Sequence, residues 1–139
     1  MYLDLKNNKD YTKLIEPAQI IKNGGLVIFP TETVYGIGAN GLDKNAIKKI
    51  YEAKQRPLNK PISLLVSNIG MIESVAKDIT DIEYAIIKKF FPGPLTIILK
   101  KKEIIPDILT AGSDTIGIRM PANDIALNLI NYAGVPIAI

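Results

Sequence analysis

Two apolar runs in the second half of the chain, Leu95 to Leu99 and Thr115 to Arg119, place the strongest constraint on its fold. Both have the length and composition of β-strands. The segment between them passes through Pro106 and Gly112 and has no helical periodicity. Parallel neighbours in a sheet need a long crossover, usually a helix, whereas antiparallel neighbours can be joined by a loop. We therefore predict a mixed, largely antiparallel sheet.

Start and stop signals bracket four helical segments. The third segment opens with the capping-box spacing at Thr80, and we expect Ile82, Ile86 and Phe90 to face the core. The predicted helices run from Pro17 to Asn23, from Asp43 to before Pro57, from Thr80 to before Pro92, and from Asn123 or Asp124 to Gly134.

Three further apolar runs predict buried strands, at Leu26 to Phe29, Ile62 to Val66 and Val135 to Ile139. A length of 139 residues suits one domain. We therefore expect a single α/β (α+β) domain over residues 1–139, in which helices flank a twisted mixed sheet.

Composition excludes several kinds of chemistry. The chain has no cysteine and no histidine, so disulfides, thiol nucleophiles and imidazole bases are absent. A net charge of +3 permits anionic ligands but does not identify one. No apolar run reaches the roughly 18 residues of a membrane span. We expect a cytoplasmic protein without a membrane partner, whose chemistry depends on Lys, Arg, carboxylate, hydroxyl and backbone groups.

A run of hydroxyl side chains follows the strand that ends near Phe29. If this run is extended, Thr31, Thr33 and Tyr35 share one face, and Glu32 and Val34 point elsewhere. Three hydroxyls on one face suit a polar ligand. Threonine and tyrosine are also common in strands because of their β-propensity, so both interpretations stay open.

The next residues match the pattern GxGxxG at Gly36, Gly38 and Gly41. A dinucleotide site needs these glycines at a strand-to-helix turn, with an acidic residue about 20 positions later. Lys54, Arg56 and Lys60 occupy that later region. We therefore reject a Rossmann site, and we expect the glycines to allow close approach of a ligand or a neighbouring strand.

The segment Lys54 to Pro61 is basic, and Arg56 and Lys60 both precede prolines, which favours extended backbone. Lys54 and Arg56 can then point the same way and bind phosphate, the arginine through paired hydrogen bonds and the lysine as a point charge. A solvated basic loop is the alternative.

The strand from Thr115 to Arg119 alternates cleanly. Thr115, Gly117 and Arg119 share one face, and Ile116 and Ile118 share the other. Arg119 is thus a candidate carboxylate ligand, unless it is simply an exposed arginine. We expect the run Lys100 to Lys102 to be a solvated loop, and RNA contact by these lysines is the weaker alternative.

The order of these motifs resembles the YrdC family of threonylcarbamoyl-adenylate synthases along nearly the whole chain. Several separated motifs in the right order are far more specific than any one short pattern. The motifs are PTETVYGIG (30–38), KQRP (54–57), KPIS (60–63), FFPGPLT (90–96), TIGIRMP (115–121) and GVPIAI (134–139).

The resemblance implies a three-layer YrdC/RibB-like fold with a twisted mixed sheet around a positively charged cavity. It also implies a nucleotidyltransferase reaction in which L-threonine, bicarbonate and ATP give threonylcarbamoyl-AMP and pyrophosphate, with Mg²⁺ on the phosphates. A downstream enzyme then transfers the threonylcarbamoyl group to tRNA, and tRNA itself is a possible partner. An RNA-binding module with a basic cavity and no catalysis is the alternative.

The resemblance also implies roles for individual residues, and it identifies no metal ligand from the protein. Thr33 and Arg119 would bind threonine, Arg56, Lys60 and Thr115 would bind ATP, Lys54 and Arg56 would form the catalytic KxR element, and Tyr35 would line the cavity wall.

The family continues past its last strand with a Ser-x-Asn element of the nucleotide site, whereas this sequence stops at Ile139. We therefore expect a domain truncated at its C-terminus, with weak or absent synthesis by this polypeptide alone. A related sugar-phosphate lyase is disfavoured, because Glu32 alone does not supply the acidic cluster that its chemistry needs.

Overall fold

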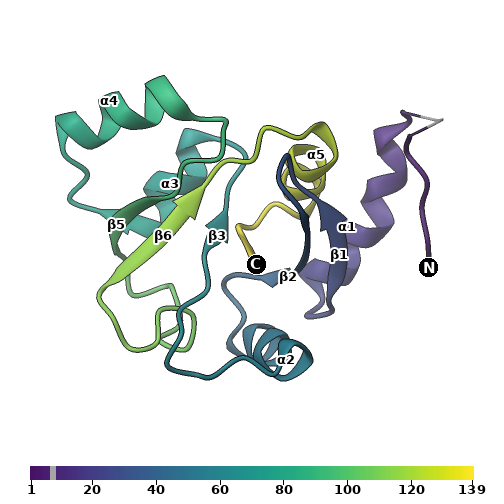
Figure 1. The fold of residues 1–139 in the computed structure, drawn as a ribbon, viewed down its shortest axis with the longest axis horizontal. Coiled ribbons are helices and arrows are strands. Elements are labelled where there is room, and N and C mark those ends of the chain that lie inside the picture. Colours follow the sequence, from purple (N-terminus) through teal and green to yellow (C-terminus); the bar gives the residue numbers. More distant parts are fainter. Residues whose placement is uncertain (7–8) are drawn as a thin grey trace.

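A mixed sheet forms the centre of the molecule in the computed structural model, which describes residues 1–6 and 9–139 (Figure 1). Within those residues the strand order is β1-β2-β7-β3-β6-β5-β4. Strands β3 and β6 pair in parallel, and the other described pairs are antiparallel. The prediction of a mixed, largely antiparallel sheet is therefore confirmed. The strands are β1 (Val27–Pro30), β2 (Tyr35–Asn40), β3 (Leu64–Leu65), β4 (Ala76–Lys77), β5 (Ile97–Lys101), β6 (Thr115–Arg119) and β7 (Ile137–Ala138).

The predicted helices all form, and their caps explain their bounds. Asp43 accepts from the N–H of Ala46, Asn123 accepts from the N–H of Ala126, and Thr80 forms the expected capping box. No helix in the described part of the chain has the length and hydropathy to span a membrane. The helices are η1 (Tyr11–Leu14, 3₁₀), α1 (Ile15–Lys22), α2 (Lys44–Lys54), α3 (Ile69–Val75), α4 (Asp81–Phe90) and α5 (Asp124–Ala133), of which η1 and α3 were not predicted.

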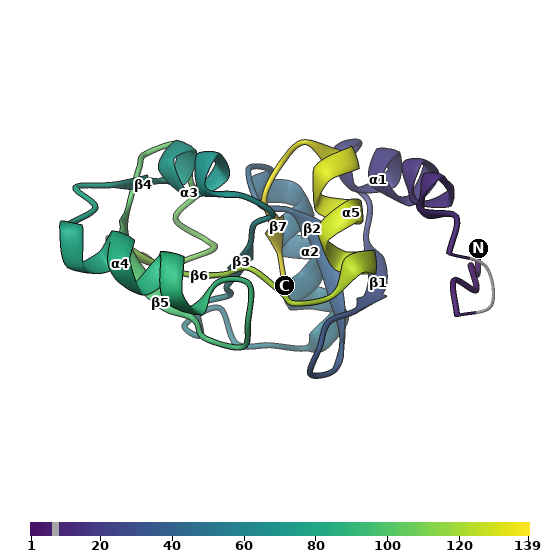
Figure 2. The ribbon, with the colours of Figure 1, turned by 90° about the horizontal axis from the view of Figure 1, so that it is seen from above.

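Adjacent residues of the central strands belong to different cores, which shows the layers directly. Ala138 and Leu64 pack into a core with α2, α3 and α4, whereas Ile137 and Leu65 pack into a second core with α1 and α5. Successive side chains of a strand point to opposite faces of a sheet. The sheet is therefore the middle layer of three, with α1 and α5 side by side on one face (Figures 1 and 2).

The inner face predicted for α4 is only partly right, because Ile86 packs against the core but Ile82 and Phe90 are exposed. Ile82 and Phe90 are 74% and 47% exposed, and Ile87 is the fully buried residue of the helix. Tyr84 lies on the same face as Ile87 and donates a hydrogen bond to Glu73 of α3. Packing against α3 therefore decides which side of α4 faces inward. The apolar spacing of the sequence is not sufficient to predict it.

The glycines of the GxGxxG match pack strands together. Gly36 and Gly38 lie within β2, not at a strand-to-helix turn. A Cβ on Gly38 would lie 2.6 Å from the Phe29 ring and 2.7 Å from the Ile137 side chain. A Cβ on Gly36 would collide with Ile139. The rejection of a Rossmann site is confirmed.

The run Lys100 to Lys102 is not a solvated loop, because its first two residues belong to β5. Lys101 pairs with Asp107 at 3.0 Å, and its side chain is 12% exposed. Lys102 donates to the carbonyl of Glu73 at 2.7 Å. Two of the three lysines therefore have structural partners.

Candidate functional site

The segment Thr31 to Val34 is a tight turn that joins β1 to β2, and the extended alternation predicted for it is wrong. Pro30 pairs with Tyr35 across the hairpin. The Thr31 N–H and hydroxyl both donate to the carbonyl of Val34, at 3.0 and 2.8 Å. Threonine hydroxyls stabilise turns by such local hydrogen bonds. The turn still brings the Thr31 and Thr33 hydroxyls together, 3.0 Å apart.

Arg119, at the end of β6, meets this turn. Its Nη2 donates to the Thr33 hydroxyl at 3.3 Å and to the Glu32 carboxylate. Its Nε donates to the carbonyl of Gly93 at 3.4 Å. The Arg119 and Glu32 side chains are only 17% and 20% exposed. The structure therefore brings together the two residues that were assigned to threonine, Thr33 and Arg119.

Glu32 is the site residue that sequence reasoning missed, because it was expected to point away. Its other carboxylate oxygen accepts from the N–H of Ala122, just before α5. The hairpin turn is thereby tied both to the end of β6 and to the start of α5. The partners of Glu32 are 87 and 90 positions away in the sequence, so no local pattern signals them.

Burial lowers the pKa of the Arg119 guanidinium from its ordinary value. Arginine nevertheless stays protonated in proteins. The loop after α4 supports it, since the Gly93 N–H donates to the carbonyl of Met120 at 2.8 Å. Arg119 is therefore a fixed, permanently charged group suited to an anionic ligand.

The face of β6 that carries Arg119 is the face predicted. Ile116 and Ile118 are buried, whereas Thr115, Gly117 and Arg119 are half-buried on the other side. A Cβ on Gly117 would lie 3.1 Å from the Thr96 methyl and 3.3 Å from the Ser63 hydroxyl. These two hydroxyl residues therefore flank Gly117, and sequence reasoning had assigned neither of them to the site.

The basic loop after α2 is held by its own backbone. Arg56 donates to the carbonyls of Lys60 and Pro61, at 3.2 and 2.8 Å. The Tyr51 hydroxyl donates to the carbonyls of Lys60 and Ile108, at 2.7 and 3.0 Å. Lys54 and Lys60 are exposed, and Arg56 is half-buried. Arg56 thus shapes this loop, and the two lysines leave their charges facing solvent.

Strand register places this loop relative to the Arg119 end of the site. Leu64 of β3 lies beside Ile118 of the parallel strand β6, so the residues that lead into β3 approach the Thr115 end (Figure 1). Thr115 lies 3.0 Å from Ser113, hydroxyl to hydroxyl. The rise of about 3.3 Å per residue puts Thr115 and Arg119 about 13 Å apart. No described hydrogen bond or ion pair joins the basic loop to the Thr33 and Arg119 pair.

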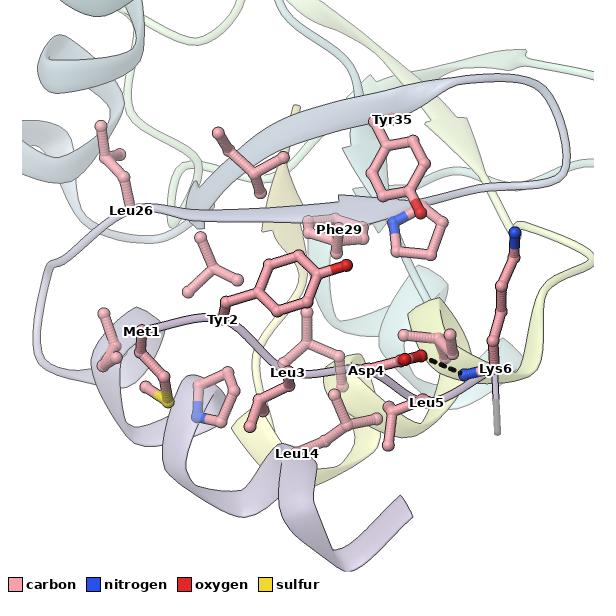
Figure 3. Close-up of a pocket in the computed structure, with 17 residues that line it drawn as sticks. Met1, Tyr2, Leu3, Asp4, Leu5, Lys6, Leu14, Leu26, Phe29 and Tyr35 are labelled. Atoms are coloured by element: carbon pink, nitrogen blue, oxygen red, sulfur yellow. Dashed lines mark hydrogen bonds between the residues drawn. The ribbon is translucent and has the colours of Figure 1, made fainter. Parts of the chain in front are cut away.

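Tyr35 lies next to the turn, and it lines a different cavity. A groove of about 620 Å³ separates the N-terminal segment from β1, and Tyr35, Phe29 and Leu5 are among its lining residues (Figure 3). Tyr35 is 71% exposed, and no described contact links it to Arg119. The groove is lined chiefly by apolar side chains. The predicted wall residue thus faces a cavity separate from the Arg119 pair.

Within residues 1–6 and 9–139, no group of three or more acidic, histidine or cysteine side chains could hold a metal ion. Glu32 is an acidic residue in contact with Arg119, and both of its carboxylate oxygens already accept hydrogen bonds. The described residues therefore do not form a Mg²⁺ cage.

Comparison with known proteins gives consistent matches. The Sua5/YciO/YrdC family model, described as "Telomere recombination", matches residues 19–139. The threonylcarbamoyl-AMP synthase of Pyrococcus abyssi is 44% identical over 136 residues, which are 98% of this chain and 40% of that protein. The Bacillus subtilis enzyme of the same name is 40% identical over 127 residues, which are 91% of this chain and 37% of that protein.

A solved structure agrees in fold. The crystal structure of P. abyssi Sua5 complexed with L-threonine has a TM-score of 0.90 and 46% identity, over 93% of this chain and 38% of that one. The chain therefore spans about two fifths of the length of these relatives. The matched family model covers most of the chain and the three-layer fold is shared, so this chain belongs to the Sua5/YciO/YrdC family.

Proposed function

We propose that this chain carries the L-threonine and ATP sites of a threonylcarbamoyl-AMP synthase, a nucleotidyltransferase. The observation that carries the proposal is the meeting of Arg119 and Thr33 at one end of a half-buried sheet face. The names of the relatives and the L-threonine complex of P. abyssi Sua5 support it. They favour this enzyme over the RNA-binding module.

The Arg119 end of the face suits the amino acid. A fixed guanidinium binds carboxylates well, because its remaining N–H groups form charge-assisted hydrogen bonds with carboxylate oxygens. The Thr33 hydroxyl lies 3.3 Å from Arg119 Nη2 and can bond the same ligand. We propose that Arg119 binds the carboxylate of the L-threonine ligand. The Thr33 hydroxyl would then bind the other polar groups of that ligand.

The other end of the face suits the nucleotide. Lys54 at the end of α2 and Lys60 in the loop after it are exposed. Arg56 shapes that loop, and Thr115 contributes a hydroxyl where β6 starts. Lysine acts on phosphate as a point charge. We assign the phosphates of ATP to this loop. Tyr35 lines the separate N-terminal groove, so we assign it to neither the threonine end nor the nucleotide end of this face.

The reaction needs no covalent enzyme intermediate. The threonine amine captures bicarbonate-derived carbon dioxide as a carbamate, and a carbamate oxygen then attacks the α-phosphate of ATP. The bond between the α-phosphorus and the bridging oxygen breaks, and pyrophosphate leaves. The protein residues position the two reactants across about 13 Å of β6 and balance negative charge. Mg²⁺, when bound to ATP, would neutralise phosphate charge.

The product, threonylcarbamoyl-AMP, is an activated acyl donor, so we expect a downstream enzyme to transfer its threonylcarbamoyl group to tRNA. The lack of cysteine suits the reducing cytosol, and we place the reaction there.

Isothermal titration of the purified chain with L-threonine tests the amino-acid site. We expect binding by the wild-type chain, with Kd raised about tenfold by Thr33→Val and more by Arg119→Lys, since each change removes a polar contact with a charged or hydrogen-bonding ligand. Thr12→Val, at an exposed position of η1, is the matched control and should leave Kd unchanged.

Pyrophosphate release with ATP, bicarbonate and L-threonine tests the chemistry. Any release should depend on threonine and should fall with Lys60→Ala. Release that ignores threonine, or a wild-type chain that does not bind threonine, would contradict the proposed function.

A further inference from the structure

We propose that Glu32 is a positioning residue that orients Arg119 toward the carboxylate of the bound amino acid. This inference rests on the proposed threonine site, and it adds to that site a residue for which neither the sequence motifs nor the residue types suggested a role. Three observations carry it: which Arg119 donors are used, which are left over, and how Glu32 is itself fixed.

The used donors of the guanidinium are on Nε and Nη2. Nε donates to the Gly93 carbonyl, and Nη2 donates to the Glu32 carboxylate and the Thr33 hydroxyl. These three acceptors come from the loop after α4 and from the hairpin turn. Together they fix the plane of the guanidinium, which a single acceptor would not do.

The unused donors are on Nη1, which enters no hydrogen bond with any described residue. No buried side-chain nitrogen or oxygen in residues 1–6 and 9–139 lacks a partner. An unpartnered Nη1 must therefore reach the surface. Glu32 thus occupies the Nη2 side and leaves Nη1 to an incoming anion.

Glu32 is held at two points, and this gives it a defined orientation. One carboxylate oxygen accepts from Arg119, and the other accepts from the N–H of Ala122. A carboxylate can accept at both oxygens, whereas a carboxamide accepts at one and donates at the other. Glutamine at this position would set its own N–H₂ against an N–H of Arg119 or Ala122. Glu32→Gln therefore changes few atoms but cannot satisfy both partners.

A double-mutant cycle on threonine affinity tests the proposal, with Glu32→Gln, Arg119→Lys and the double variant. We expect Glu32→Gln to raise the Kd for L-threonine about tenfold, the effect of one lost charge-assisted hydrogen bond, and to leave the Kd for ATP unchanged. In the Arg119→Lys background the same change should alter Kd by less than about twofold, because the group that Glu32 positions is gone.

Glu83→Gln is the matched control. Glu83 also accepts from a backbone N–H, that of Thr80 at 2.9 Å, in the capping box of α4. The Glu83→Gln substitution should leave the Kd for L-threonine unchanged. Thermal unfolding of every variant shows whether the fold is intact, and Glu32→Asp, which keeps the charge on a shorter side chain, should recover part of the affinity.

The outcomes separate the two proposals. A wild-type chain that does not bind L-threonine overturns the proposed function, and this inference with it. Normal wild-type binding with an unchanged Kd in Glu32→Gln overturns the positioning role alone. Equal losses from Glu32→Gln in both backgrounds would assign Glu32 to direct contact with the ligand, and would also overturn that role.

Discussion

Gly41 follows β2 where the chain passes against the segment before β7. Its N–H donates to the carbonyl of Pro136 at 2.9 Å. A Cβ at this position would lie 2.9 Å from that same carbonyl oxygen and would collide with the side chain of Leu64. At the scale of the residue, Gly41 therefore matters because the absence of a side chain leaves room for Pro136 and Leu64. The close approach between β2 and β7 depends on that space.

We expect Gly41→Ala to lower the free energy of unfolding by about 1–3 kcal/mol, the usual cost of overpacking a core. Backbone of the β7 segment must move to accommodate the methyl group, because a carbonyl oxygen cannot rotate away as a side chain can. Urea denaturation followed by circular dichroism measures the change. An unchanged midpoint would show that the two segments can separate freely.

At the scale of the element, β4 and β5 carry an unfavourable pair. Lys77 of β4 lies directly opposite Lys100 of β5, and both residues are exposed. Like charges directly opposite each other in a strand pair are destabilising. Lysine also keeps edge strands from pairing with other chains, and β4 is the last strand of the described sheet. The edge is thus protected at some cost in stability.

Lys77→Glu should replace this repulsion with attraction and raise the free energy of unfolding by about 0.5 kcal/mol. Lys77→Gln removes the repulsion without adding attraction, so it should give a smaller gain. The difference between the two variants should shrink in high salt, because exposed charges are screened. Equal stabilities of all three proteins, measured in urea at low salt, would refute this account.

At the scale of the whole molecule, Tyr51 links parts that are distant in the sequence. It extends from α2, and its hydroxyl donates to the carbonyls of Lys60, in the basic loop, and Ile108, in the loop before β6. Burial raises the pKa of the Tyr51 hydroxyl, and the nearby Arg56 charge partly opposes that shift. The neutral hydroxyl therefore holds the proposed nucleotide loop against the sheet.

We expect Tyr51→Phe to lower the free energy of unfolding by about 1–3 kcal/mol, since two carbonyls lose their donor. It should also weaken ATP binding more than threonine binding. The folded state favours the neutral phenol, so this contribution is complete below the ordinary pKa of 10.0 and is lost as pH rises through the raised pKa of the folded state.

Unfolding of the wild-type and Tyr51→Phe chains across this alkaline range measures the effect. Their difference in stability should be constant below pH 10 and shrink above it. A constant difference throughout would mean that the hydroxyl stays neutral at every pH or contributes nothing.

The sequence by itself determined the features that depend on neighbouring residues. The caps at Asp43 and Thr80 were predicted, and Asn123 was one of two candidates for the last cap, because a cap and the N–H that it accepts from are three positions apart. The alternation of β6 follows from the two-residue period of a strand. The antiparallel pairing of β5 with β6 follows from the loop that joins them. The motifs also pointed correctly to the family.

Tertiary structure alone decided which distant groups meet. Glu32 contacts Arg119 and Ala122 across more than half of the chain, Arg56 turns back to its own loop, and α4 buries Ile87 in place of Ile82. Such contacts depend on how whole elements pack, and packing is set by the shape and charge of surfaces that do not yet exist in the linear chain. Local patterns record the propensities of neighbouring residues, whereas the surroundings of Arg119 are assembled from three separate segments.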